Sequence, residues 1–294
     1  MTRTTRDRAR HGMIRAVSSS SPVRIVYSDL DGTMVGPRGS FWLDAERRLT
    51  DVPSRALLDL HHAGIDLVLV SGRTRLQLVE AGRIFGADGF IAELGSVVAW
   101  SGWREHQVLP GQMPSSYDGR TPFDVIATLG VPDQLFARYP GQLEWHSPWH
   151  IGHEVDAMIR GCVNVAEAEV WLAAQGWGWL TLRDNGTLPI SRSTGLSPKG
   201  LPAHVYHLMP RGLSKGLALA WDLQRRGIDP ADAMAIGDSI SDLEMADSVS
   251  RLWLTANGLA DPEVAAQAAA RNNVSVCDEA VGLGWAQAIR SILP

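Results

Sequence analysis

The sequence predicts an α/β protein in which a Rossmann-like parallel sheet, flanked by helices, carries an inserted α+β unit. Short apolar runs, such as residues 65–70, alternate with segments of helical periodicity, such as residues 53–63. This order is typical of parallel strands joined by crossover helices. The alternation stops near residue 98 and resumes after residue 207, and seven of the eleven tryptophans lie between residues 100 and 180. We interpret this stretch as the insert.

The elements before the insert can be assigned in order. Residues 23–28 (VRIVYS) are rich in β-branched and aromatic side chains and predict a buried strand. Residues 53–63 predict a helix that ends at Gly64, a residue suited to a helix C-terminus. Residues 65–70 (IDLVLV) form a nearly continuous apolar run, as a strand buried on both faces requires. A helix over residues 74–85 and a short strand over residues 89–92 follow.

The insert is expected to span residues 98–207, which leaves residues 23–97 and 208–294 for the core. Residues 178–182 and 187–191 flank Asp184-Asn185-Gly186 and predict a β-hairpin, because Asn-Gly favours its tight turn. Helices are predicted over residues 115–129, broken by Pro122, and over residues 166–175. In the second part of the core, predicted helices alternate with predicted strands. Strands are predicted over residues 233–236, 252–254 and 274–276. Helices are predicted over residues 214–226 and 262–270, with a further helix that starts at residues 242–246 and a closing helix that starts near residue 278.

Composition limits what the chain binds and where it works. A net charge of −5 gives no reason to expect nucleic acid or an anionic membrane as a partner, and no apolar run is long enough to span a bilayer. Cys162 and Cys277 lie in no metal-ligand spacing, so we expect free thiols in a reducing cytoplasm. Residues 1–22 lack apolar periodicity and are expected to be a disordered tail, unless translation starts at Met13. The sequence does not indicate the oligomeric state.

Four polar motifs follow predicted strands or begin predicted helices. The first strand ends in Asp29 and Asp31, whose mutual repulsion a divalent cation or a shared proton would relieve, although an acidic turn has the same pattern. The other motifs are Ser71-Gly72-Arg73, Lys215 in LSKG, and Gly237-Asp238-Ser239 with Asp242. A nucleophilic carboxylate, an acid/base, acidic ligands for Mg²⁺, and a hydroxyl and a lysine for phosphoryl oxygens are the groups that phosphoryl transfer needs.

In this order, the motifs resemble the four signatures of the haloacid dehalogenase (HAD) superfamily of phosphohydrolases, over residues 22–290. The resemblance implies that Asp29 is the nucleophile and Asp31 the acid/base. Ser71 and Lys215 would bind the phosphoryl group. It also implies that Thr33 and Gly72 belong to the phosphate-binding loops, and that Arg73 is either a contact to phosphate or substrate or a surface charge. The implied Mg²⁺ ligands are Asp29, the carbonyl of Asp31, Asp238 and Asp242.

The insert lies between the second and third motifs, which resembles the C2B-type cap of subfamily IIB, the Cof-like and sugar-phosphatase branch. That branch includes sucrose-phosphate, trehalose-phosphate and mannosyl-3-phosphoglycerate phosphatases and phosphomannomutases. The resemblance implies a Mg²⁺-dependent phosphatase of a small phosphorylated metabolite, with a sugar or glycosyl phosphate favoured, that acts through an aspartyl-phosphate. A phosphomutase and a non-catalytic binding protein remain as alternatives. Leu94 stands where many relatives have asparagine, which removes a possible polar contact and leaves the substrate open.

The cap is expected to select the substrate, and its aromatic residues are the first candidates for that task. Tryptophans can stack on sugar rings, but they can equally fill the small core of the cap, which we favour for most of them. Trp145 and Trp149, within EWHSPWHIGH, are flanked by polar residues and are candidates for substrate contact. His146, His150 and His153 lack a carboxylate or cysteine pattern, so we interpret them as surface or substrate-facing groups and not as zinc ligands.

Overall fold

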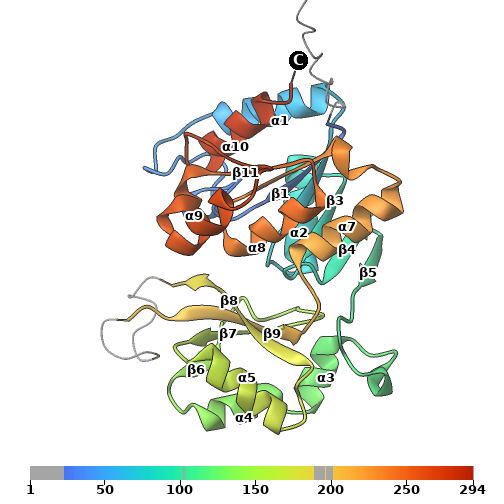
Figure 1. Cartoon of the computed structure of the whole chain (residues 1–294), viewed down its shortest axis with the longest axis vertical. Coiled ribbons are helices and arrows are strands. Elements are labelled where there is room, and N and C mark those ends of the chain that lie inside the picture. Colours follow the sequence, from blue (N-terminus) through green and yellow to red (C-terminus); the bar gives the residue numbers. More distant parts are fainter. Residues whose placement is uncertain (1–22, 102, 189–195, 197–200, 294) are drawn as a thin grey trace, which may run out of the picture.

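The larger of two sheets is organised around β1 (Ile25–Asp29), which lies near its centre. β1 pairs in parallel with β2 (Asp66–Val70) on one side and with β10 (Ala233–Gly237) on the other. The full order is β12-β11-β10-β1-β2-β3-β4-β5, with antiparallel pairing from β3 to β5. The other strands are β3 (Gly89–Ala92), β4 (Val97–Trp100), β5 (Glu105–Val108), β11 (Arg251–Leu254) and β12 (Val274–Val276). The computed structural model in Figure 1 describes residues 23–101, 103–188, 196 and 201–293.

Helices cover both faces of this sheet, because successive side chains of its central strands point to opposite faces. Val26 and Leu67 pack with α1 (Val52–His62), α2 (Arg75–Phe85) and α10 (Val281–Arg290). Ile25 and Val68 pack with the helices of the opposite face, α7 (Lys215–Arg226), α8 (Ile240–Leu243) and α9 (Pro262–Ala269). Short 3₁₀ turns connect the elements: η1 (Pro37–Gly39), η3 (Pro230–Asp232), η4 (Glu244–Ser248) and η5 (Ala256–Ala260). The predicted α/β layer is confirmed.

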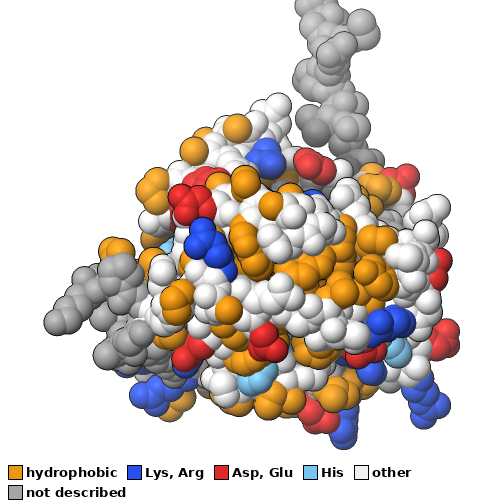
Figure 2. Space-filling view, turned by 90° about the horizontal axis from the view of Figure 1, so that it is seen from below, with side chains coloured by type: hydrophobic (Ala, Val, Ile, Leu, Met, Phe, Trp, Pro, Cys, Tyr) orange, Lys and Arg blue, Asp and Glu red, His pale blue; other side chains and the backbone are white. Residues whose placement is uncertain are grey.

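A second sheet, antiparallel and four-stranded, forms the cap in the order β6-β7-β9-β8. Its strands are β6 (Leu143–Trp145), β7 (Ala157–Gly161), β8 (Leu180–Thr187) and β9 (His204–Pro210). The helices α3 (Pro122–Thr128), α4 (Val131–Arg138) and α5 (Val165–Ala174) lie on the side away from the larger sheet (Figure 1). Viewed from below, this helical side carries hydrophobic side chains among scattered charges (Figure 2). The uncovered face of the cap sheet is therefore turned toward the core.

The insert begins later and ends later than predicted. β4 and β5 pair with β3 in the larger sheet, so the core extends to Val108 and the expected boundary at residue 98 is wrong. At the other end, β9 continues the cap sheet to Pro210. Trp100 is one of the clustered tryptophans that suggested the insert. It packs instead on the core helix α7, with its ring 5.7 Å from that of Trp221. A cluster of tryptophans therefore did not mark the domain boundary.

The predicted hairpin around Asp184-Asn185-Gly186 is also wrong. These residues lie within β8, which continues to Thr187 and pairs with β9. The register shifts between Asp184 and Thr187, and Gly186 has a φ of +95°, so the Asn-Gly pair makes an irregularity in a strand and not a turn between two strands. Most of the strand predicted over residues 187–191 lies outside the described residues, as does the tail over residues 1–22.

Proline begins helices in the cap where it was expected to break one. Pro122 is the first residue of α3, a position that its missing N–H and fixed φ suit, and η2 (Ser115–Tyr117) precedes it. The helix α4, which also has a proline in its first turn, was not predicted. None of the described helices has both the length and the apolar composition needed to cross a membrane.

Candidate active site

The carboxyl ends of β1, β2 and β10 meet at the edge of the larger sheet that faces the cap. Asp29 is the last residue of β1 and is 5% exposed. Its Oδ1 accepts a hydrogen bond of 2.7 Å from Nζ of Lys215, and the same ammonium group donates to Oδ1 of Asp242 at 2.6 Å. Lys215 begins α7 and Asp242 lies in α8. Three elements that are distant in the sequence thus bring these predicted residues into one buried cluster.

Three carboxylates share this small volume. Oxygen atoms of Asp29, Asp238 and Asp242 lie within 4.8 Å of one another. Burial and the charge of Asp242 raise the pKa of Asp29 well above its ordinary value, although Lys215 opposes them. Burial and Asp242 likewise raise the pKa of Asp238 to about 7. Oδ2 of Asp29 is buried and has no hydrogen-bond partner among the described residues. Three carboxylates that lie this close together and repel one another fit a divalent cation.

Lys215 stays charged in this cluster, and the carboxylate of Asp242 is held in a fixed orientation. Burial alone would lower the pKa of Lys215, but Asp242 and Asp29 raise it above its ordinary value. Oδ2 of Asp242 accepts hydrogen bonds from the hydroxyl and the backbone N–H of Ser239 and from the backbone N–H of Asp238. This capping arrangement at the start of α8 directs the other oxygen of Asp242 toward Lys215.

Asp31 lies outside the buried cluster. Its carboxylate is 51% exposed and accepts two hydrogen bonds of 2.6 Å from the guanidinium group of Arg73. Gly32, the next residue, has a φ of +90°, and a Cβ there would lie 2.3 Å from Oδ2 of Asp238. A side chain at this position would therefore both strain the turn and clash with the acidic cluster. Thr33 donates from Oγ1 to Oδ1 of Asp238 at 3.2 Å, so it orients an acidic side chain.

The end of β2 supplies the second predicted motif. Ser71 is buried, and its Oγ accepts a hydrogen bond of 3.3 Å from the backbone N–H of Arg73. Gly72 lies in a narrow space between core and cap. A Cβ built on it would lie 3.2 Å from Nδ2 of Asn185 and 3.6 Å from Cε1 of His207, both of which belong to the cap. The predicted phosphate motif therefore lies directly beneath two polar side chains of the cap.

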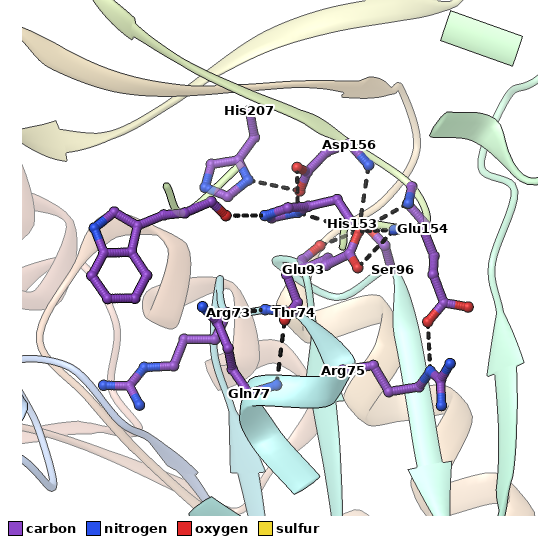
Figure 3. Close-up of polar contacts among 12 residues, drawn as sticks. Arg73, Thr74, Arg75, Gln77, Glu93, Ser96, His153, Glu154, Asp156 and His207 are labelled. Carbon is purple, nitrogen blue, oxygen red and sulfur yellow. Dashed lines mark hydrogen bonds and ion pairs between the residues drawn. The ribbon is translucent and has the colours of Figure 1, made fainter. Parts of the chain in front are cut away.

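Two residues that hold this site together were not predicted. Asn257 follows β11 and donates from Nδ2 to the carbonyl of Gly32 at 2.9 Å and to Oδ2 of Asp238 at 3.0 Å. Its position just after the strand predicted over residues 252–254, at the same sheet edge, was an available signal. Glu93, between β3 and β4, accepts hydrogen bonds from the backbone N–H groups of residues 154–156 in the cap (Figure 3). No local pattern around Glu93 reveals that distant contact.

Comparison with known proteins finds a match to one protein family. The model of the haloacid dehalogenase-like hydrolases matches residues 199–275, which contain Lys215, Asp238 and Asp242. Over this segment the chain is similar to the haloacid dehalogenase-like hydrolases, and it is called the hydrolase below. Over 277 residues it is 26% identical to a phosphoglycolate phosphatase of Methanoculleus marisnigri, with 92% of this hydrolase and 97% of that protein covered. A phosphoglycolate phosphatase of Pyrobaculum aerophilum is 27% identical over 271 residues, which cover 92% and 96% of the two chains.

Solved structures share the fold of this hydrolase at low sequence identity. The sucrose-phosphatase of Synechocystis, solved with sucrose and phosphate, has a TM-score of 0.62 at 16% identity and covers 92% of the hydrolase and 98% of its own chain. A protein from Thermoplasma acidophilum has a TM-score of 0.62 at 14% identity, with coverage of 92% and 99%. Both alignments extend over nearly the whole length of each chain, which confirms the predicted fold.

The cap of the hydrolase changes the interpretation of several predicted residues. Trp145 packs inside the cap, with its ring edge-on to Phe136 at 5.7 Å, so it contributes to the cap core. Trp149 is 51% exposed and stays a candidate for substrate contact. The interpretation of His146 and His153 as surface or substrate-facing groups is wrong, because both are buried. Burial of two histidines in one loop indicates polar partners inside the protein.

Leu94 occupies a position at which the family resemblance implies an asparagine. The residue has a φ of 55°, a backbone conformation that asparagine adopts more readily than leucine. Its side chain is buried in the core beneath α2, and a Cβ built on Gly72 would lie 3.4 Å from its Cδ2. Burial of the Leu94 side chain therefore offsets the free-energy cost of its left-handed backbone conformation. It also places an apolar group beside the phosphate motif.

Proposed function

We propose that this hydrolase is a Mg²⁺-dependent phosphatase that cleaves the monoester of a small phosphorylated metabolite through an aspartyl-phosphate, with sugar or glycosyl phosphates favoured. The observation that carries the proposal is the environment of Asp29. One carboxylate oxygen is held by Lys215, while the other is buried without a hydrogen-bond partner among the described residues. A carboxylate fixed in this way has a free oxygen with which to attack phosphorus.

The residues divide the proposed reaction into two displacements. Asp29 attacks phosphorus while the bond between phosphorus and the alcohol oxygen breaks, and Asp31 gives that oxygen its proton. Asp31 then takes a proton from the water that attacks the aspartyl-phosphate, which releases phosphate and restores Asp29. Lys215 remains cationic and offsets the charge on the non-bridging oxygens, to which Ser71 donates a hydrogen bond.

The acidic cluster and Arg73 complete the proposal. Asp29, Asp238 and Asp242 would hold Mg²⁺ together with the backbone carbonyl of Asp31, and the bound ion would add positive charge at the phosphoryl oxygens. Arg73 pairs with the carboxylate of Asp31 at 2.6 Å. A phosphate oxygen competes for the same guanidinium group, so substrate binding would free Asp31 to act as an acid.

A phosphomutase would use the same nucleophile but return the phosphoryl group to a sugar instead of to water. The phosphatase is favoured because the named relatives, a sucrose-phosphatase and phosphoglycolate phosphatases, are hydrolytic enzymes. Their names also add phosphoglycolate to the substrates that need testing. A non-catalytic binding role is the weakest candidate, since Asp29, Asp31, Lys215, Asp238 and Asp242 all keep side chains suited to the chemistry.

The test is a measurement of phosphate release from a panel of esters. The panel contains hexose phosphates, glycosyl phosphoglycerates, phosphoglycolate and p-nitrophenyl phosphate, each with Mg²⁺, with a chelator, and with Ca²⁺ in place of Mg²⁺. We expect release with Mg²⁺, none with chelator, and poor activity with Ca²⁺, because its larger and looser coordination misplaces the nucleophile. Full activity in chelator contradicts the metal requirement. Isomerisation of a hexose phosphate without phosphate release would show a mutase.

A further inference from the structure

The face of the cap sheet that is turned toward the catalytic residues carries a pair of polar side chains. Along β9, Tyr206 and Leu208 pack into the hydrophobic core of the cap, so His207 points to the opposite face. Asn185 of β8 lies beside it, with 3.2 Å between Nδ2 of Asn185 and Nε2 of His207. Both side chains lie within 4 Å of the position that a Cβ on Gly72 would take. The pair therefore covers the phosphate motif.

A chain of hydrogen bonds determines which way the amide of Asn185 points. His207 is fully buried, and its Nδ1 lies 2.7 Å from Oδ2 of Asp156. Burial would raise the pKa of Asp156, but the neighbouring histidines lower it below its ordinary value, so Asp156 is an ionised acceptor. Nδ2 of Asn185 is a donor, so the lone pair that faces it lies on Nε2 of His207, and Nδ1 of this ring donates to Asp156. Asn185 donates to this lone pair through Nδ2, and its Oδ1 points elsewhere.

A second histidine fixes Asp156 in turn. Nδ1 of His153 lies 2.7 Å from Oδ1 of Asp156 and 3.6 Å from Oε2 of Glu93 (Figure 3). Nε2 of His153 faces the backbone carbonyl of Trp149 at 3.0 Å. Because both ring nitrogens face acceptors, His153 is an imidazolium, and although burial lowers its pKa, Asp156 and Glu93 raise it to about 11. The network that orients Asn185 is thus anchored on Glu93 of the core.

We propose that Asn185 recognises the leaving group of the substrate by accepting a hydrogen bond at Oδ1 from a hydroxyl group, and that His207 is a positioning residue for Asn185. This inference rests on the proposed phosphatase function, in which the phosphoryl group binds at Ser71 and the leaving group extends from it toward the cap. The side chain of Asn185 is exposed, and no residue in the described part of the chain donates a hydrogen bond to its Oδ1. His207 is fully buried and acts through Asn185.

The orientation of the amide selects a chemical class of substrate. A hydroxyl group donates to Oδ1 of Asn185, whereas a carboxylate has only acceptor atoms and meets the partial negative charge of this oxygen. Leu94, the apolar neighbour of Gly72, offers no competing polar contact. Phosphomonoesters of polyols and sugars, with a hydroxyl near the ester carbon, are therefore better substrates than phosphomonoesters of hydroxy acids such as phosphoglycolate.

The test compares glycerol 1-phosphate with propyl phosphate, which has the same carbon skeleton without hydroxyl groups. We expect the wild-type hydrolase with Mg²⁺ to have a higher kcat/KM for glycerol 1-phosphate. Asn185→Ala should lower the ratio of the two kcat/KM values by about five- to tenfold, the effect of losing one hydrogen bond. Thr187→Ala is the matched control, because it shortens another exposed side chain of β8, and it should leave the ratio as in the wild type.

A variant of the positioning residue separates its role from general stability. His207→Asn places an amide nitrogen near the former Nδ1, so the hydrogen bond to Asp156 is kept, but it has no atom at the position of Nε2. We expect KM for glycerol 1-phosphate to rise more than KM for propyl phosphate. The double variant with Asn185→Ala should lose little more than Asn185→Ala alone, because both changes remove the same contact. A merely structural role would lower activity on both esters equally.

Several outcomes overturn the inference. They are an unchanged ratio in Asn185→Ala, a wild-type preference for propyl phosphate, and a wild-type preference for phosphoglycolate over glycerol 1-phosphate. Asn185→Ala decides the matter even if His207→Asn does not fold, because residue 185 is exposed. If no ester at all releases phosphate from the wild-type protein with Mg²⁺, the proposed phosphatase function itself fails, and this inference falls with it.

Discussion

Asp29 is the residue whose loss should affect activity most. In Asp29→Asn an amide replaces the proposed nucleophile and cannot attack phosphorus, so turnover should fall by more than about a thousandfold. The fold should persist, because Lys215 keeps its ion pair with Asp242 at 2.6 Å. Phosphate release and a thermal melt of the pure variant measure both effects. Asp59→Asn, which changes an exposed carboxylate of α1, is the control. Near-normal release by Asp29→Asn would show that another group attacks.

The loss of activity on replacing Asp31 should be larger for a substrate whose leaving group is a poorer one. Asp31→Asn removes the proposed proton donor, so the first step should slow by about 10²- to 10⁴-fold for an alkyl phosphate. The loss should be smaller for p-nitrophenyl phosphate, whose leaving group needs no proton. Rapid-mixing measurements of alcohol and phosphate release separate the first step from hydrolysis of the intermediate. Equal losses for the two esters would argue against Asp31 as the acid.

The sequence allowed residues of the site to be predicted where a fold places chemistry at fixed points. Asp29, Ser71 and Asp238 each end a strand or follow one directly, so their convergence follows from the parallel sheet alone. Asp156 and His207 could not be predicted as partners. Their contact of 2.7 Å depends on which strands of the cap become neighbours, and short strands in an antiparallel sheet do not encode that choice locally.

At the scale of elements, the turn between β3 and β4 joins the core to the cap. Glu93 in this turn is fully buried and accepts hydrogen bonds from three backbone N–H groups of the cap. Glu93→Ala leaves these N–H groups without an acceptor and removes one of the two carboxylates beside the His153 cation, so it should lower the free energy of unfolding by about 2–5 kcal/mol. Urea denaturation measures the change. Glu80→Ala, which removes an exposed carboxylate of α2, should have no measurable effect. Equal stability of the two variants would mean that water accepts the hydrogen bonds of these backbone N–H groups in place of Glu93.

The strand β6 and the loop after it provide a paired test of the cap tryptophans. Trp145 packs against Phe136 within the cap, so Trp145→Ala should destabilise the protein by about 3 kcal/mol. Trp149 is 51% exposed, and Trp149→Ala should melt at a temperature closer to that of the wild type. Thermal melts compare the two variants. A stable Trp145→Ala protein with altered substrate preference would return Trp145 to the binding site.

Elements were predictable where the local pattern and the tertiary pairing agree. The apolar run over residues 65–70 became β2 because a strand between two parallel neighbours is buried on both faces. Asn185-Gly186 failed as a turn because β8 pairs with β9 on both sides of this irregularity, through Asp184 before it and Thr187 after it. The Asn-Gly preference for tight turns is a local energy of modest size, and a ladder of backbone hydrogen bonds outweighs it.

At the scale of the whole molecule, the acidic cluster should couple stability to pH and to the proposed Mg²⁺. The pKa of Asp238 is about 7 in the folded chain against an ordinary value of 3.8. Between about pH 4 and pH 7 the folded chain keeps a proton that the unfolded chain has lost, so the free energy of unfolding falls as pH rises through this window. The proposed Mg²⁺ would bind the ionised form, so it would have to displace this proton below pH 7.

We therefore expect Mg²⁺ to raise the Tm more at pH 8 than at pH 6. A tenfold loss of affinity at the lower pH corresponds to about 1.4 kcal/mol less stabilisation at saturating metal. Calorimetry at both pH values, with and without Mg²⁺, gives the two shifts. Asp247 is an exposed residue of η4, and Asp247→Asn should keep the difference between the two Tm shifts. Asp238→Asn should reduce this difference. Equal shifts at both pH values would show that Asp238 is not a ligand.

The insertion of the cap into the core has a consequence for biosynthesis. β1 lies between β2 and β10 in the finished sheet, yet β10 begins at Ala233, after the entire cap has been made. A nascent chain that has left the ribosome through Pro210 contains every strand of the cap sheet, while one side of β1 is still unpaired. An apolar strand with a free edge can pair with other chains, so this interval favours aggregation or chaperone binding. A truncation before residue 233 would leave an exposed edge where the complete enzyme has its central strand.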